Sequence, residues 1–500
     1  MATANLNENS PLINVAGVIA RDNEQRLSCR TPAGKGVLCV LLVVFFERLA
    51  YYSITINLVS FSDKLFKDIG VQGLTVNLLF QGTAFFLPLV AGIIADTLLG
   101  KKKILASFFP IYILGSLLFT ISGVSGVVQE AKVILFVAGL SLCTVGAAGV
   151  RACLTPYGAD QIETKDSQRS FFHWSYFVIN VSSLIAVTGI NYIELEEGYW
   201  SGYVVAPCSL LCALVFFHVG NRWCRETEQP SYLLFVAVKH LTGQAKRGNT
   251  HQLPERNRLA VDPNDAKAFA NVLVCISTLL GFSVVYSAYQ TVYTLQGEHM
   301  NATVIGGKEI TSSSLSAFDN AVILLIIPIV DRVVWPCLMS RGIRVSYLHR
   351  IGFGILCGIL SVLAALLVEH YRHTGLSIMA QVPQYVLMGL GEILAFIPCY
   401  EMAYIESPAF TKSTTMGLVW TTSGIGFYIS AFVINLVEES QNIELVSDWF
   451  PMNDEDPKLS YPFLILEAVV VVFFILYLIV ACTRKPKNGE NRGNGRHEIV

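Results

Sequence analysis

Residues 36–60 read GVLCVLLVVFFERLAYYSITINLVS, an apolar run whose centre holds an acid and a base, Glu47 and Arg48. A helix that crosses a bilayer needs about 20 apolar residues in succession, so this run is long enough to span. Similar runs recur along the whole chain. The twelve predicted spans are 36–60, 74–99, 104–125, 131–155, 171–192, 201–220, 269–295, 315–335, 348–369, 378–404, 414–437 and 459–482. The runs are continuous and not alternating, which predicts helices and excludes a β-barrel.

The composition supports a membrane protein. Of the 500 residues, 53% are hydrophobic and 14% are charged, whereas roughly a quarter of an ordinary soluble domain is charged. A water-soluble core cannot bury that much apolar side chain, so we expect the lipid bilayer to be the solvent. This composition disfavours a nucleic-acid-binding protein and a disulfide-rich secreted scaffold.

The basic residues predict the orientation, because Lys and Arg accumulate in cytosolic loops. Residues 1–35 lack the apolar segment of a signal peptide, so we expect the N-terminus in the cytosol. With that orientation, few of the 35 Lys and Arg residues face the other side; they are Lys64, Lys67, Lys132, Lys308, Arg372 and Lys458. An even number of spans then places both termini in the cytosol.

A polar, basic break at 221–268 divides the spans into six and six. This layout predicts the major facilitator superfamily, in which two related six-helix bundles form an all-α membrane protein. The expected domains are a cytosolic tail (1–35), a bundle (36–220), a cytosolic linker (221–268), a second bundle (269–482) and a cytosolic tail (483–500). A weak internal repeat agrees with this division, since Asp96 ends the second span and Asp331 ends the eighth.

Ionisable side chains inside the first six spans are functional candidates, because burying a charge in the membrane is costly. Glu47 and Tyr51 are four residues apart on the first helix, as are Arg48 and Tyr52, so all four share one broad stripe. Arg151 is a second cation within the fourth span. A substrate carboxylate could pair with these guanidinium groups. The alternatives are an internal ion pair that fixes helix packing and, for Arg151, a contact with backbone near a helix end.

The tenth span carries two acids, Glu392 and Glu401. Nine residues is two and a half helical turns, so the two side chains point in opposite directions on a straight helix. Pro398 could kink the helix between them, and we expect at most one acid to face a central cavity. A carboxylate opposite two arginines suits a zwitterionic substrate. Asp319 and Glu467 are weaker candidates, more typical of packing or entrance positions.

Other chemistry is not indicated. The twelve cysteines fall in spans or on the cytosolic side, so we expect no disulfides. No metal-ligand spacing, phosphate loop or nucleophile elbow is present, which argues against an enzyme, a metal site, a bound cofactor or ATP-driven transport. Asn301-Ala302-Thr303 is a glycosylation sequon in a predicted non-cytosolic loop.

Several stretches together resemble the proton-coupled oligopeptide transporter (POT/PTR) family, and most closely the peptide/histidine branch of solute carrier family 15. They cover nearly the whole chain and are Glu47–Tyr52 (ERLAYY), Gly92–Lys101 (GIIADTLLGK), Val150–Gln161 (VRACLTPYGADQ), Phe171–Asn180 (FFHWSYFVIN), Gln381–Tyr385 (QVPQY) and Tyr400–Pro408 (YEMAYIESP). The resemblance implies proton-driven transport of di- and tripeptides and of histidine, with the proton as coupling ion.

The resemblance also implies roles for individual residues. Arg48 and Arg151 would hold the peptide carboxylate, and Tyr51 and Tyr52 would line the pocket. The amino end of the peptide would meet Glu401, assisted by Asn180, and Glu47 and Glu401 would serve proton coupling. The family's first-span element E-x-x-E-R has an acid three residues before Glu47, where this chain has Val44. The alternatives are that proton coupling rests on Glu47 and Glu401 alone, is weakened, or is absent.

The N-terminus fits the acidic-dileucine pattern of a sorting signal, in which three residues separate Glu8 from Leu12 and Ile13. Sorting adaptors in the cytosol would direct such a protein to endosomes and lysosomes; a plain disordered tail, and the plasma membrane, are the alternatives. The sequence therefore predicts a symporter from the endolysosomal lumen to the cytosol. Its rivals are an uncoupled transporter, a transporter of another substrate such as nitrate, and a non-transporting scaffold that recruits cytosolic signalling proteins through 221–268 and the C-terminal tail.

Overall fold

The computed structural model describes residues 31–67, 70–225, 230–241, 263–303, 310–343, 345–440 and 460–483, and these residues are almost entirely helical. Within this part of the chain, twelve helical segments are long and apolar enough to cross a membrane. They confirm the predicted all-α architecture of twelve spans. The first begins at Pro32 and the last ends at Thr483.

The first six spans are assembled from ten α-helices and two π-helical turns. Their bounds are α2 (Pro32–Thr55), α3 (Leu58–Phe66), α4 (Gly73–Phe86), α5 (Pro88–Ile94), η1 (Ala95–Leu99), α6 (Lys101–Ser122), α7 (Gln129–Ala159), α8 (Lys165–Ile185), η2 (Ala186–Ile190), α9 (Asn191–Glu197), α10 (Tyr199–Tyr203) and α11 (Val205–Gly220). The third and fourth spans are the single helices α6 and α7, whereas the others contain breaks.

The last six spans follow a short linker helix, α12 (Leu233–Leu241). Their bounds are α13 (Pro263–Ser277), α14 (Leu280–Glu298), η5 (Ser312–Leu315), α15 (Ser316–Ile329), η6 (Val330–Val334), α16 (Trp335–Ser340), α17 (Tyr347–Tyr371), η7 (Arg372–Thr374), η8 (Ile378–Gln381), α18 (Val382–Ile405), η9 (Ala409–Thr411), α19 (Lys412–Ser440) and α21 (Ser460–Thr483). Of these short turns, η6 is π-helical, like η1 and η2 in the first half.

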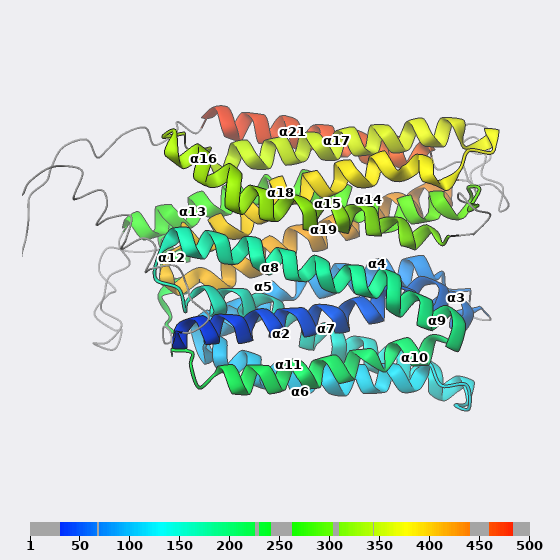
Figure 1. Ribbon diagram of the computed structural model, residues 1–500, viewed down its shortest axis with the longest axis horizontal. Coiled ribbons are helices and arrows are strands. Elements are labelled where there is room, and N and C mark those ends of the chain that lie inside the picture. The colour runs from blue at the N-terminus through cyan, green and yellow to red at the C-terminus, as the bar shows by residue number, and fades with distance from the viewer. Residues whose placement is uncertain are drawn as a thin grey trace, which may run out of the picture.

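The two sets of six spans form two layers, with α2–α11 in the lower half of Figure 1 and α13–α21 in the upper half. The layers meet mainly through two helices, α8 and α19. Helix α8 of the first half packs against α15 and α18, and α19 of the second half packs against α4, α5 and α7. We call these layers the N-bundle and the C-bundle. The face where α2 begins and α21 ends is the predicted cytosolic face, at the left of Figure 1.

Local sequence explains where these helices begin and how closely they pack. The Thr31 side chain accepts a hydrogen bond from the Gly34 amide (3.1 Å), and Pro32 occupies the first helical position, so α2 starts with a capped turn. Helices α6 and α7 approach through glycine. A Cβ atom on Gly115 would lie 2.6 Å from the backbone nitrogen of Cys143, so only glycine permits this contact.

The linker predicted at 221–268 contains a helix that ties the bundles together at the predicted cytosolic face. Helix α12 contacts η1 of the N-bundle and both α13 and η9 of the C-bundle. Its Ala237 packs against Ala266, with Leu233, Val236 and Phe410 around them. The apolar sequence LLFVAVKHL supplies this packing, although the surrounding linker is polar. Helix α13 also begins earlier, at Pro263, than the predicted start of the seventh span at 269.

Candidate functional site

A cavity of about 440 Å³ lies between the two bundles. Its deep end is lined by side chains from the middle of the spans, including Arg48, Tyr176 and Glu392. Its mouth is lined by residues such as Ser60 and Glu298, which are exposed at the face opposite the termini. The structure is therefore outward-facing, with its central cavity open away from the predicted cytosolic side.

Four of the predicted substrate-binding residues lie on the cavity wall: Arg48, Tyr51, Tyr52 and Asn180. The first three project from α2, because a spacing of three or four residues places them on one helix face. Asn180 projects from α8, where its side-chain amide donates to the Tyr176 carbonyl (2.9 Å). Three residues of the predicted stripe thus face the cavity, whereas the fourth, Glu47, does not.

Glu47 and Arg48 form a buried two-point ion pair. The Arg48 Nε and Nη2 atoms donate to the two Glu47 carboxylate oxygens at 2.5 and 2.6 Å. Only Arg48 lines the cavity, and Glu47 lies behind it. The Arg48 guanidinium carbon is also 5.3 Å from the centre of the Tyr51 ring and 5.9 Å from that of Trp420. The cavity wall therefore presents a cation whose charge is already compensated.

Arg151 is a buried cation that pairs with no carboxylate in the part of the chain that the structure describes. Its Nη1 donates to the Ala84 carbonyl (2.9 Å), but its Nε and Nη2 atoms are buried without a hydrogen-bond partner among the described residues. The guanidinium carbon lies 4.1 Å from the Tyr51 ring centre and 4.2 Å from that of Phe85. Aromatic faces offset part of the cost of burying a cation. Both rings line the cavity whereas Arg151 does not, so this cation sits one side chain behind the wall.

The C-bundle wall carries two carboxylates. Glu392 on α18 accepts a hydrogen bond from the Tyr176 hydroxyl at 2.5 Å. Asp319 on α15 accepts one from the Tyr289 hydroxyl at 2.9 Å, and its Oδ1 atom is buried without a hydrogen-bond partner among the described residues. Both acids line the cavity. The sequence identified Asp319 only as a weaker candidate, more typical of a packing or entrance position, and the structure places it on the cavity wall.

Glu401 does not occupy the position that the resemblance implied. It is fully buried and lies off the cavity, where Arg169 donates to one of its oxygens and Arg350 Nη2 donates to the other at 2.7 Å. The half-turn offset over nine residues points Glu392 toward α8 and the cavity, and Glu401 toward this arginine pair. The residue that faces the C-bundle side of the cavity is therefore Glu392, which corrects the assignment of Glu401 to the amino end of a peptide in this conformation.

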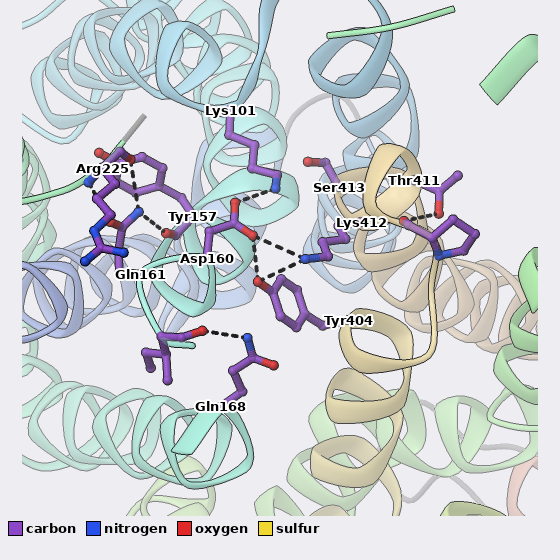
Figure 2. A network of polar contacts seen from close by, with 12 residues as sticks. Lys101, Tyr157, Asp160, Gln161, Gln168, Arg225, Tyr404, Thr411, Lys412 and Ser413 are labelled. Carbon is purple, nitrogen blue, oxygen red and sulfur yellow. Dashed lines mark hydrogen bonds and ion pairs between the residues drawn. The ribbon is translucent and has the colours of Figure 1, made fainter. Parts of the chain in front are cut away.

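Polar contacts join the two bundles at the predicted cytosolic face, and Figure 2 shows one network of them. Asp160 of the N-bundle stands at the centre of one network. Its Oδ2 atom pairs with Lys101 (2.5 Å), and its Oδ1 atom accepts a hydrogen bond from the Tyr404 hydroxyl of the C-bundle (2.6 Å) and lies 3.7 Å from Lys412 Nζ. Together with Arg169–Glu401, this network joins the cytosolic ends of α7 and α8 to α18 and α19.

Two further aspartates close the same face in a pseudo-symmetric way. Asp96, in the π-turn of span two, accepts hydrogen bonds from the Thr414 amide (2.7 Å) and hydroxyl (2.8 Å) at the start of span eleven. Asp331, in the π-turn of span eight, accepts from Ser170 (3.0 Å) and Trp174 (3.2 Å) at the start of span five. Spans two and eight, and spans five and eleven, occupy equivalent places in the two halves. The internal repeat in the sequence thus corresponds to a repeated contact between the bundles.

The remaining predicted sites lie away from the cavity. Asn301 is exposed in the loop after α14, on the face opposite the termini, and its Oδ1 accepts from the Thr303 amide (3.0 Å). The sorting residues Glu8, Leu12 and Ile13 lie outside the described residues.

Comparison with known proteins agrees with this architecture. A model of the POT family matches residues 102–450, well over half of the chain. Protein NRT1/PTR FAMILY 8.5 of Arabidopsis thaliana is 27% identical over 88% of this chain and 88% of its own length. Protein NRT1/PTR FAMILY 8.2 of the same plant is 28% identical, over 87% of this chain and 90% of its own.

Solved structures share the fold. The crystal structure of an auto-inhibited POT family peptide transporter superposes with a TM-score of 0.70 at 19% identity, covering 92% of this chain and 99% of that one. The POT family transporter PepTSo gives a TM-score of 0.70 at 18% identity, over 90% and 98% of the two chains. These likenesses show the fold of the major facilitator superfamily. With its twelve spans, its central cavity and its family match, the chain belongs to the POT family of proton-coupled transporters and is a transporter, not an enzyme.

Proposed function

We propose that this chain is a proton-coupled symporter that moves di- and tripeptides, and histidine, from the endolysosomal lumen to the cytosol. The observation that carries the proposal is the charge arrangement across the cavity. Arg151 in the N-bundle has two unpartnered guanidinium nitrogens, and Glu392 in the C-bundle has no cationic partner among the described residues. A peptide zwitterion supplies the missing anion and cation at its two ends.

Two structures with the same fold support this chemistry. One is a POT family transporter in complex with 5-aminolevulinic acid and another is such a transporter with a thioalcohol-conjugated peptide. Each of these ligands is a small molecule, as the cavity of about 440 Å³ requires. A lone anion such as nitrate would satisfy Arg151 but would leave Glu392 unpaired. The two-sided charge pattern therefore favours a zwitterion.

Proton coupling is assigned to the pair Glu47–Arg48. A proton on Glu47 would end the two-point ion pair and free Arg48, which lines the cavity, to join Arg151 at the substrate carboxylate. Val44, which replaces the first acid of the family element, is buried in the apolar core and offers no second site for a proton. This observation favours the rival function, an uncoupled transporter, so the coupling step needs a direct test.

The test is uptake of a labelled dipeptide and labelled histidine into proteoliposomes, with and without an inward proton gradient. We expect the gradient to stimulate uptake. Glu47→Gln should abolish the stimulation, because the glutamine amide is not ionisable and cannot carry the coupled proton. The matched control is Glu196→Gln, which removes an exposed carboxylate from the end of α9. Uptake that ignores the gradient would establish a facilitator. If neither substrate enters, from folded protein, the proposed substrate class is wrong.

The endolysosomal location rests on the N-terminal signal and on the resemblance to the peptide/histidine branch. Changing Leu12→Ala together with Ile13→Ala should move a fluorescently tagged protein to the plasma membrane, because adaptors recognise the paired aliphatic side chains. The control is Asn5→Ala with Leu6→Ala, a double substitution in the same tail but outside the motif, and it should leave the location unchanged. A Leu12 and Ile13 double variant that stays in endolysosomes would contradict this sorting role.

A further inference from the structure

The C-bundle side of the cavity carries more carboxyl groups than a single peptide ammonium can pair with. Among the described residues that line the cavity, the charged ones are Arg48, Glu298, Asp319 and Glu392. Arg48 is compensated by Glu47. A bound zwitterion would place its carboxylate near Arg151 and its ammonium near Glu392. Asp319 would then remain as a buried carboxylate without a counter-charge, and Glu298 belongs to the exposed mouth.

Asp319 is built into the wall beside Glu392. Its side chain is 3% exposed, its Oδ2 is held by the Tyr289 hydroxyl, and its Oδ1 is unpartnered among the described residues. Gly389 makes room for it, because a Cβ atom there would lie 2.8 Å from Asp319 Oδ1. Gly389 and Glu392 are three residues apart on α18, so Asp319 packs within one helical turn of Glu392.

The aromatic side chains around these two acids favour an organic cation. Four tyrosines that line the cavity surround this region: Tyr176, Tyr286, Tyr289 and Tyr400. The Tyr286 ring lies 5.9 Å from that of Tyr289, and the Tyr176 ring lies 6.3 Å from that of Tyr400. Tyrosine faces attract ammonium groups through their quadrupole. Two of these phenols also donate to the acids, and so they hold the carboxylates in place.

We propose that Asp319 and Glu392 form a subsite for two ammonium groups, so that the cavity prefers substrates with a second cationic group beside the α-amino group. This subsite rests on the proposed function, because it assumes that the cavity binds small amino-carboxylate substrates. The preferred class comprises peptides whose N-terminal residue carries a basic side chain. Glu392 binds one ammonium and Asp319 binds the other.

The experiment compares two dipeptides of equal shape, 2,4-diaminobutyryl-alanine and norvalyl-alanine, as competitors of labelled dipeptide uptake in proteoliposomes at neutral pH. Their first side chains differ by an ammonium in place of a methyl group. We expect the cationic peptide to bind at least about tenfold more tightly to the native protein, the effect of one buried charge-assisted hydrogen bond. In Asp319→Asn we expect the two peptides to bind within about twofold of each other.

Glu298→Gln is the matched control, because it removes the same charge from the mouth of the cavity and not from the subsite. We expect its preference for the cationic peptide to persist. Equal affinities of the two peptides for the native protein would overturn the subsite and leave the proposed function intact. A preference that survives in Asp319→Asn would also overturn it, with Asp319 then holding a proton. A native protein that does not take up the labelled dipeptide would overturn the proposed function itself.

Discussion

At the residue scale, the cavity depends on charges that are buried at a cost. An isolated ion in a medium of low dielectric constant costs several kcal/mol, and Arg151 keeps two guanidinium nitrogens without hydrogen-bond partners among the described residues. The aromatic rings of Tyr51 and Phe85 offset this cost only in part. A site that retains such a cation gains most when an anion arrives. Binding of a substrate carboxylate near Arg151 is therefore favourable, because the carboxylate supplies the anionic partner that this buried cation lacks among the described residues.

Arg151→Ala should remove the preference for a free carboxylate. We expect the native protein to bind a dipeptide roughly tenfold to a hundredfold more tightly than its methyl ester, since a hydrogen bond to a charged group contributes about 1.5–3 kcal/mol. The variant should bind both forms equally and weakly. The measurement is competition against labelled dipeptide uptake. Arg151→Lys, which keeps the charge but loses the fork of donors, should retain part of the preference. Equal losses of affinity for acid and ester would exclude the carboxylate role.

Part of the site was predictable from the sequence, residue by residue. The intramembrane ions and the opposite orientations of Glu392 and Glu401 were predictable, because both follow from hydropathy and from the helical repeat. The choice between the two glutamates was not, since it depends on which neighbours pack against each face of α18. Arg169 and Arg350, which bind Glu401, come from α8 and α17. No local pattern links these three segments of the chain.

At the element scale, helix ends and π-turns position the contacts between the bundles. Asp96 and Asp331 each lie in a π-turn, η1 or η6, at the predicted cytosolic end of a span. The sequence predicted the repeat but not the turns, because a π-turn inserts one residue into an otherwise regular helix without a distinctive composition. The Asp96 carboxylate is also stabilised by the N-terminus of α19, where a backbone amide donates to it and the helix dipole favours an anion. Span eleven is thereby anchored to span two.

Close contact between α5 and α19 should be required for the outward-facing state. A Cβ atom on Gly92 would lie 2.8 Å from the carbonyl carbon of Ser413, so Gly92→Leu should force the two helices apart at the predicted cytosolic end. Overpacking costs about 1–3 kcal/mol, which corresponds to roughly a 5- to 150-fold shift toward the inward-facing state. The measurement is the rate at which a maleimide labels Ser60→Cys at the cavity mouth. The protein is held in nanodiscs, and its exposed native cysteines are replaced. Labelling should be slower in Gly92→Leu, because the mouth is closed in the inward-facing state.

Gly189→Leu provides the control for this wedge. A Cβ atom on Gly189 would meet no atom within 4 Å, and the residue is exposed on span five. With Gly189→Leu, the rate of maleimide labelling at Ser60→Cys should equal the rate in the protein that carries Ser60→Cys without a glycine substitution. A Gly92→Leu protein that labels as fast as this control would show that the α5–α19 contact does not set the conformation.

At the scale of the whole molecule, the contacts between the two bundles differ in chemistry from one face to the other. The predicted cytosolic face is closed by ion pairs and charge-assisted hydrogen bonds that cross between the bundles, through Asp160, Glu401, Asp96 and Asp331. On the opposite face, the described contacts between bundles are neutral and weaker, such as Asn191 to Thr311 at 3.3 Å. Inward opening must therefore break the ionic contacts. Substrate and proton bias this exchange only through different affinities for the two states.

Glu401→Gln should shift the whole molecule toward the inward-facing state, whereas Glu392→Gln should not. The first change deprives Arg169 and Arg350 of their shared carboxylate, and because Arg169 is partly exposed we expect a loss on the order of 1–3 kcal/mol of closing energy. Spin labels at Lys165→Cys and Ser340→Cys, on the exposed cytosolic ends of α8 and α16, should then show a larger population of long distances.

Glu392→Gln should leave these distances unchanged and weaken binding of peptides with a free amino group, but not of N-acetylated ones. Identical distance distributions in all three proteins would mean that Glu401 does not control closure, and its structural role would then be confined to the ion pair with Arg350 inside the C-bundle.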